Sequence, residues 1–248
     1  KEDNGNRLRK FDYIVSNPPF KLDLSDFRDQ LDTKANQKRF FAGIPKIPNK
    51  DKGKMAIYLL FIQHVIHSLA PNGRAAIVVP TGFITAQSGI EKGIRQYLVE
   101  NKMLGGVVSM PSNIFATTGP NVSILFIAAA SKGDVILIDA SSLGEKIKEG
   151  KNQKTILRPD EEHRIIETFN AKKAVDDFAV VVSYGDIEAK NYSLSAGQYF
   201  DVKIKYVDIS AKEFSEALKD YQNRLNSLFQ DSRTLETEIT NRLRRLKV

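Results

Sequence analysis

Short apolar runs alternate with helix-forming segments along the first 140 residues, and this alternation limits the folds open to the chain. Strands are predicted at 11–15, 74–80 and 105–110. Between them, residues 55–70 and 88–101 carry apolar side chains at the spacing of a helix. Strands separated by helices are typical of a parallel α/β sheet. The run at 11–15 is continuously apolar enough to predict a buried strand.

The second half of the chain predicts a different arrangement. Runs at 122–130 and 134–140, joined by a turn at Ser131-Lys132-Gly133, predict an antiparallel hairpin at the edge of the sheet. A helix is predicted near 160–170. Residues 211–246 predict one or two long helices, because apolar residues recur there every three or four positions, as in a coiled coil. Ser232 interrupts this seam, and the helix could break there.

The segment Ser16-Asn17-Pro18-Pro19-Phe20 carries the clearest chemistry in the sequence. Two adjacent prolines end the preceding strand and fix the backbone. An adenine amine is a poor nucleophile and must be held in place; the Asn17 side-chain oxygen and the Pro18 carbonyl could accept its two hydrogens. Phe20 offers a flat face to the base, which must leave the DNA stack first. A tight turn that merely caps the strand is the structural alternative.

This segment resembles the (Asn/Asp)-Pro-Pro-(Phe/Tyr) motif of amino-group methyltransferases. The stretches 54–84, 94–127, 135–141 and 181–201 are similar to the modification subunits of type I restriction-modification systems, which are N6-adenine DNA methyltransferases. The resemblance covers nearly the whole chain from residue 11. It implies the second half of a Rossmann-like, S-adenosylmethionine-dependent α/β methyltransferase fold with C-terminal helices. It also implies that Asn17, Pro18, Pro19 and Phe20 are the catalytic residues.

The same resemblance implies the organisation and the partners. Residues 1–205 would be the C-terminal half of the catalytic domain with its extension, and 206–248 a helical, coiled-coil-like segment. The subunit would transfer a methyl group from S-adenosylmethionine to adenine N6 in DNA. The C-terminal helices would pack on a specificity subunit, with a restriction subunit as a further candidate partner.

The Gly-rich turn that holds S-adenosylmethionine in this family has no counterpart in the sequence. Gly105-Gly106 precedes a strand instead of following one, and Gly82 and Gly89 stand alone. The resemblance places the missing half before Lys1, with Asn17 next to the cofactor methyl. We therefore expect the isolated chain to be inactive. Two alternatives stay open: a non-catalytic module that docks a specificity subunit, or a methyltransferase for RNA or protein glutamine.

The chain is basic, with a formal net charge of +7, which favours polyanionic partners. Seven basic residues lie between Lys34 and Lys54. A segment this long is often functional, and it follows the Pro-Pro motif directly. DNA contacts are predicted for Lys34, Lys38, Arg39, Phe40 and Phe41; a solvated loop is the alternative.

Metal and membrane chemistry find little support in the sequence. The chain has no cysteine, and His64 and His67, three apart on one predicted helix, have no partner carboxylate, so no metal site is predicted. No apolar run approaches the length of about 20 residues that spans a bilayer. These features predict no membrane association and a cytoplasmic protein.

Overall fold

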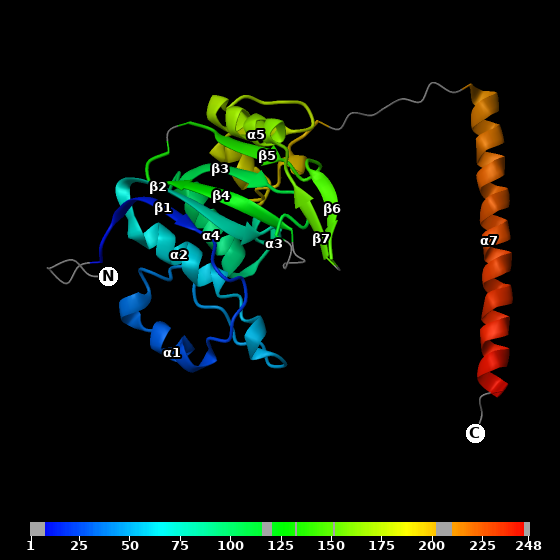
Figure 1. Cartoon of the computed structure of the whole chain (residues 1–248), viewed down its shortest axis with the longest axis horizontal. Coiled ribbons are helices and arrows are strands. Elements are labelled where there is room, and N and C mark those ends of the chain that lie inside the picture. Colours follow the sequence, from blue (N-terminus) through cyan, green and yellow to red (C-terminus); the bar gives the residue numbers. More distant parts are fainter. Residues whose placement is uncertain (1–7, 116–120, 132, 151, 202–209, 246–248) are drawn as a thin grey trace. The chain divides into compact units, whose positions relative to one another are not determined.

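The computed structural model describes residues 8–115, 121–131, 133–150, 152–201 and 210–245 (Figure 1). The chain divides into two compact units, Lys1–Phe200 and Asp201–Val248, and each is described by itself.

A six-stranded mixed sheet, in the order β1-β2-β4-β3-β5-β8, organises the described part of the first unit. Strands β1, β2, β3 and β5 run parallel to one another, while β4 and β8 run antiparallel to their neighbours. The predicted α/β class is confirmed. The strands are β1 (Phe11–Ser16), β2 (Leu69–Pro80), β3 (Leu104–Ser109), β4 (Val122–Ala128), β5 (Val135–Asp139) and β8 (Ala179–Val182).

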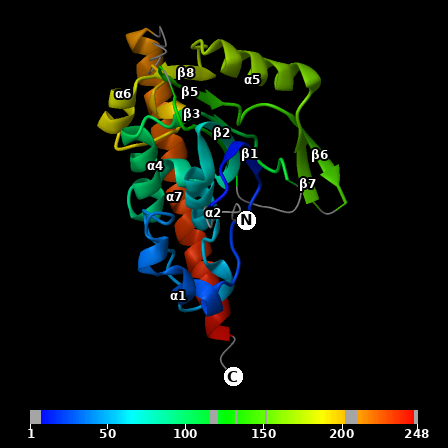
Figure 2. The same ribbon diagram turned by 90° about the vertical axis from the view of Figure 1, so that its left-hand side faces the viewer.

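Helices lie on both faces of this sheet (Figures 1 and 2). Helices α2 (Tyr58–Ser68) and α4 (Gly89–Glu100) pack on one face, where Ile62 and Leu98 meet Ile77, Leu125 and Leu137 of the sheet. Helix α5 (Pro159–Ala171) covers part of the other face. These three helices confirm the predictions for 55–70, 88–101 and 160–170. The shorter helices are α1 (Arg28–Leu31), α3 (Gly82–Thr85) and α6 (Tyr184–Ala189), and β6 (Glu145–Glu149) and β7 (Asn152–Ile156) form a separate hairpin.

Strand β1 forms as predicted, but the prediction that it is buried is wrong. Phe11, Tyr13 and Val15 are 39%, 79% and 88% exposed. The reason is position: β1 is an edge strand that pairs only with β2, so its other edge and the face carrying Tyr13 and Val15 are open in the described chain. An apolar edge of this kind is a ready site for further strand pairing.

The predicted hairpin between 122–130 and 134–140 is also wrong. Both strands form, but β3 lies between them, antiparallel to β4 and parallel to β5. Val107 and Val108 of β3 are buried, so that strand needs partners for its backbone groups on both edges. Skipping one strand takes about 10 Å, which the connection from Ala128 to Val135 can span. The predicted turn includes Lys132, which lies outside the described residues.

The described part of the second unit forms one helix, α7 (Ala211–Arg245). It continues through Ser232, so the break considered there does not occur. A serine inside a helix costs less than about 0.7 kcal/mol relative to alanine. The helical turns on either side of Ser232 outweigh this small cost. Leu246, the last residue of the predicted seam, lies outside the described residues.

Gly106 permits the close contact between β3, β5 and α5, and we predict that Gly106→Ala destabilises the fold. A β-carbon there would lie 2.7 Å from Ile136 Cγ2, from the Ile136 carbonyl oxygen and from Phe169 Cε2. Overpacking of this kind costs about 1–3 kcal/mol. Urea unfolding would measure it, with Gly197→Ala as the control, since a β-carbon at Gly197 meets nothing within 4 Å. Equal unfolding midpoints for the two variants would contradict the packing role.

Candidate functional site

The carboxyl ends of β1, β2, β3 and β5 lie along one edge of the sheet, because the four strands are parallel. Open α/β sheets bind their ligands at this edge. The Asn17-Phe20 loop follows β1, Thr81 follows β2, and Met110-Pro111-Ser112 follows β3. We refer to this side of the sheet as the ligand edge.

The Asn17-Phe20 loop combines an open side chain with a rigid base. Asn17 is exposed, and within the described residues no hydrogen bond engages its side-chain amide. Pro18 is buried and anchors the turn. Phe20 is half-buried and meets Tyr58 edge-on, with ring centroids 6.1 Å apart. The loop can therefore present the Asn17 oxygen to a ligand without first breaking a contact within the described chain.

Tyr58 connects the loop to the core behind it. Its ring meets Phe83 edge-on at 6.3 Å, and its hydroxyl lies 3.5 Å from a Glu91 carboxylate oxygen. Burial, followed by the nearby Glu91 charge, raises the pKa of Tyr58 well above its usual value. Tyr58 is therefore a neutral support for Phe20, not a proton donor near neutral pH.

Thr81, at the end of β2, lies beside the Asn17-Phe20 loop in the sheet order, and no motif in the sequence marks it. Its amide donates to the Asn121 carbonyl at 2.8 Å, and its hydroxyl lies 3.2 Å from the Ser123 hydroxyl. These bonds fix the start of the turn into α3 at the ligand edge. Its position in the sequence, directly after the strand that runs parallel to β1, could have indicated Thr81.

The structure separates the five predicted DNA contacts. Lys34 and Lys38 are exposed. Phe40 is 8% exposed and packs with Ile44, Met55, Ile57 and Leu60 in the core, so no ring face is free for a base. Phe41 stacks on Tyr97 at 3.9 Å between centroids. The two aromatic rings hold the basic segment onto the domain.

Gln63 of α2 holds the same segment through two hydrogen bonds to its backbone. Its side chain is fully buried, accepts from the Ala42 amide at 2.8 Å and donates to the Gly43 carbonyl at 3.0 Å. Because the buried Gln63 amide is fully hydrogen-bonded, it fixes the backbone at Ala42 and Gly43 in one position. The segment after the Asn17 loop is thus an ordered platform at this point.

Arg39 and His64 contact each other at the surface of the domain. Arg39 Nε donates to His64 Nδ1 at 3.1 Å, and the guanidinium lies over the Phe40 ring. Burial, then Arg39 and His67, lowers the pKa of His64; burial, then Lys10, lowers that of His67. Within the described residues no group of three or more potential metal ligands gathers.

These shifts predict a loss of stability in mild acid. Because the folded-state pKa values of His64 and His67 lie below the unfolded value of about 6.5, the unfolded chain takes up protons first as the pH falls. Stability is full above about pH 6.5 and decreases below it. We expect the urea midpoint of a His64→Gln, His67→Gln variant to drop less between about pH 7.5 and 5.5 than that of the parent. Identical drops would contradict the assignment.

The sequence of this chain matches the family model for the N-6 DNA methylases over residues 1–206. The chain belongs to the N-6 DNA methylase family. It is 31% identical over 234 residues to the methylase subunit of the type I restriction enzyme MpnII of Mycoplasma pneumoniae, covering 89% of this chain and 40% of that protein. It is 30% identical to the MjaIX methylase subunit of Methanocaldococcus jannaschii, covering 92% and 41%.

A solved structure supports the same placement of this methylase chain. The methyltransferase subunit of the type I restriction-modification system of Streptococcus thermophilus is 26% identical, with a TM-score of 0.61 over 77% of this chain and 38% of that one. The Rossmann-like methyltransferase fold and the resemblance to type I modification subunits are thus confirmed. The chain spans about 40% of the length of the curated relatives named above.

Among the described residues of this methylase chain, no turn that follows a strand contains more than one glycine. Gly105 and Gly106 lie at the amino end of β3, away from the ligand edge, and the space beside Gly106 is filled by Ile136 and Phe169. Gly106 is a packing residue. Gly82 does lie at the ligand edge with open space beside it, but it stands alone. A cofactor grip of the dinucleotide-binding type needs several glycines in one turn.

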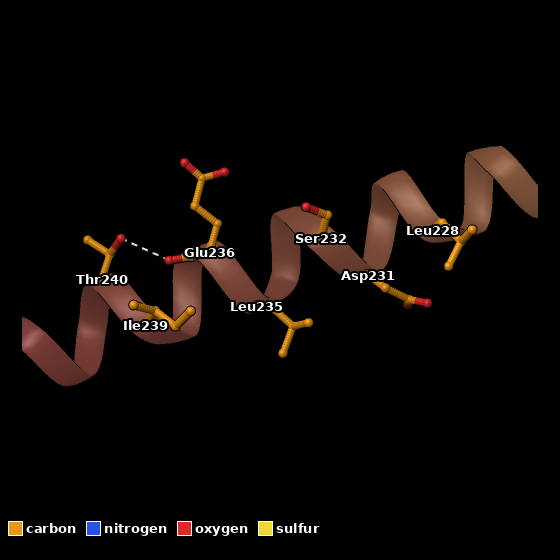
Figure 3. A pocket seen from close by; sticks show the side chains of 7 residues that line it. All are labelled: Leu228, Asp231, Ser232, Leu235, Glu236, Ile239 and Thr240. Carbon is orange, nitrogen blue, oxygen red and sulfur yellow. Dashed lines mark hydrogen bonds between the residues drawn. The ribbon is translucent and has the colours of Figure 1, made fainter. Parts of the chain in front are cut away.

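Helix α7 of the methylase chain carries an apolar stripe within its own unit. Its members follow one another at three or four residues, except across Ser232 where the gap is seven, and all are about half exposed or more: Phe214, Leu218, Tyr221, Leu225, Leu228, Leu235, Ile239 and Leu243. At the middle of the stripe Ser232 leaves a shallow hollow between Leu228, Leu235 and Ile239 (Figure 3). Asp231 and Glu236 border the hollow.

No described helix is long and apolar enough to cross a membrane.

Proposed function

We propose that this chain is the target-base half of an N6-adenine DNA methyltransferase, the modification subunit of a type I restriction-modification system. The observation that carries the proposal is the Asn17-Phe20 loop: an exposed, unengaged amide beside a braced aromatic ring at the ligand edge. Catalysis by Asn17, Pro18, Pro19 and Phe20 is part of this proposal.

The residues of the chain orient the amine of the base. The Asn17 oxygen and the Pro18 carbonyl accept the two N6 hydrogens, and the Phe20 ring supports the base plane. Two acceptors in fixed positions turn the nitrogen lone pair out of conjugation with the ring and toward the methyl donor. Positioning of this kind can supply several kcal/mol, within the ~7–11 kcal/mol available from orientation.

The methyl donor that the family implies is S-adenosylmethionine, and its principal grip would come from a part of the protein outside the described residues. The open edge of β1 supports this division, because Tyr13 and Val15 remain exposed there. Additional strands at β1, together with elements packed on that face of the sheet, would cover both side chains. They would also bring a cofactor-binding turn next to Asn17, since parallel strand ends share one edge.

Lys34 and Lys38 are the proposed phosphate contacts near the target base. Both are exposed and follow the Asn17 loop along the chain. Phosphate contacts hold the duplex in register without reading its sequence. Arg39, bonded to His64, contributes by holding the segment.

Helix α7 is the proposed docking element for a specificity subunit, and the assembly would then accept a restriction subunit. Its exposed stripe fits burial against another helix. A pull-down of the specificity subunit by the full-length protein, with and without residues 211–248, would test this docking. Retention after deletion of the helix would contradict the assignment.

Nucleoside analysis tests the function as a whole. The full-length protein with its specificity subunit and labelled S-adenosylmethionine should place the label on N6-methyladenine in a DNA digest. Label on RNA, or on glutamine of a protein, would favour the two alternative substrates. An unlabelled digest together with intact docking of the specificity subunit would favour the non-catalytic assembly module.

A further inference from the structure

The β6–β7 hairpin is fixed to the ligand edge at its base. Thr155 of β7 is 2% exposed; its hydroxyl donates to the Ser112 carbonyl at 2.6 Å and its amide to the Asn113 carbonyl at 3.0 Å. Gly144 donates to Glu161 of α5 at 3.0 Å from the other side. A two-stranded hairpin alone is at best marginally stable in water, so these bonds hold it beside the loop after β3.

The strand register shows which side chains share the anchored face. Thr155 pairs with Lys146, and Lys148 pairs with Gln153. Side chains alternate between the faces of a hairpin, so these four lie on one face. Thr155 turns that face toward the loop at 112–113. Lys146 lies directly opposite Thr155, and the Lys148–Gln153 pair comes next along the same face; all three residues are exposed.

The two lysines belong to the hairpin that is hydrogen-bonded to the loop after β3, next to the ligand edge. Within the described residues neither ammonium group takes part in an ion pair. The loop after β3 is three strand spacings from the Asn17 loop in the sheet order β1-β2-β4-β3, which is about 14 Å. That offset corresponds to about four base pairs of duplex at about 3.4 Å each.

We propose that Lys146 and Lys148 of the β6–β7 hairpin contact the DNA backbone to one side of the target adenine. The proposal rests on the proposed function, because it assumes that DNA lies on the ligand edge. Lys34 and Lys38 hold the duplex near the flipped base, and the hairpin holds it about four base pairs away. Gln153, on the same face, adds a neutral hydrogen-bonding group that suits a phosphate or sugar oxygen.

Salt dependence tests the proposal, because each lysine–phosphate contact releases counterions when it forms. The full-length protein with its specificity subunit would be titrated with a fluorescent duplex between about 50 and 200 mM salt. The double variant Lys146→Gln, Lys148→Gln should reduce the slope of log K against log salt by about 1.8, or about 0.9 per contact. In methylation assays its DNA KM should rise while its kcat stays unchanged.

Lys102→Gln, Lys173→Gln is the matched control, since both lysines are exposed and follow α4 and α5, next to the amino ends of the strands. An unchanged slope in the hairpin variant, with the parent binding DNA normally, would overturn the hairpin contact and leave the proposed function standing. A parent that does not bind DNA would overturn both. An equal reduction in the control variant would overturn the local assignment in favour of overall charge.

Discussion

Replacing Asn17 by alanine in the full-length methylase should lower kcat for adenine methylation by about 100-fold or more. Removing one preorganised hydrogen-bonding group from an active site typically costs about 100–1000-fold in kcat. Here the lost group is the side-chain oxygen that would hold one N6 hydrogen. Single-turnover methyl transfer to a duplex containing the recognised site would measure the rate. The folded state should be unaffected, because the Asn17 side chain is exposed and makes no hydrogen bond within the described chain.

Two further variants show whether the loss of rate comes from the missing hydrogen-bond acceptor at position 17. Asn17→Asp retains an acceptor at the same position and should keep more activity than Asn17→Ala. Asn72→Ala removes an exposed asparagine far from the ligand edge, near the start of β2, and should leave the rate unchanged. If Asn17→Ala methylated at the parental rate, the base-holding role of the loop would be wrong. If only DNA binding fell, Asn17 would be a docking residue.

Replacing Arg95 by alanine should destabilise the fold by about 3–5 kcal/mol, the usual cost of removing one partner from a buried charged network. Arg95 is fully buried on α4. It donates to the Tyr192 carbonyl at 2.7 Å and to the carbonyls of Phe83 and Ala86. Burial lowers its pKa to about 10, so it stays charged at neutral pH. Without it, three carbonyls that join α4, α3 and the segment after α6 lose their donor.

Urea unfolding of the parent and the variant measures this loss. Glu100→Ala at the exposed end of the same helix should change stability by less than about 0.5 kcal/mol, and Arg95→Lys should lie between the two because it keeps the charge with fewer donors. With a typical total of about 5–15 kcal/mol, Arg95→Ala would leave a marginal protein. If Arg95→Ala had the same unfolding midpoint as Glu100→Ala, the stabilising role of the Arg95 hydrogen bonds would be wrong.

Local sequence patterns predicted which helices and strands form better than they predicted which strands pair with each other. The helical spacing of 55–70 and 88–101 gave α2 and α4 because one face of each helix must be buried. The order of strands is a long-range property, and the short link from Ala128 to Val135 suggested a hairpin that β3 in fact separates. The apolar run of β1 suggested burial, yet Val15 is exposed because no described element covers the face of the sheet to which it points.

The place of the candidate site in the fold was predictable because the Pro-Pro motif directly follows a strand. The Asn17 loop follows a strand directly, and the parallel sheet places that strand end at the ligand edge. The aromatic residues of the basic segment were misleading, because composition does not distinguish a ring that stacks on a base from one that stacks on Tyr97. Arg95 and Thr155 gave no sequence signal, since their side chains bond to backbone carbonyls, which any residue type provides.

The most direct test of the account is calorimetric titration of S-adenosylmethionine into the 248-residue chain. The proposed division places the target base on this chain and the main cofactor contacts on another part of the protein. It therefore predicts no saturable heat for this chain, and one-to-one binding for the full-length subunit. Saturable one-to-one binding by the 248-residue chain alone would contradict that division and place a cofactor site among these residues.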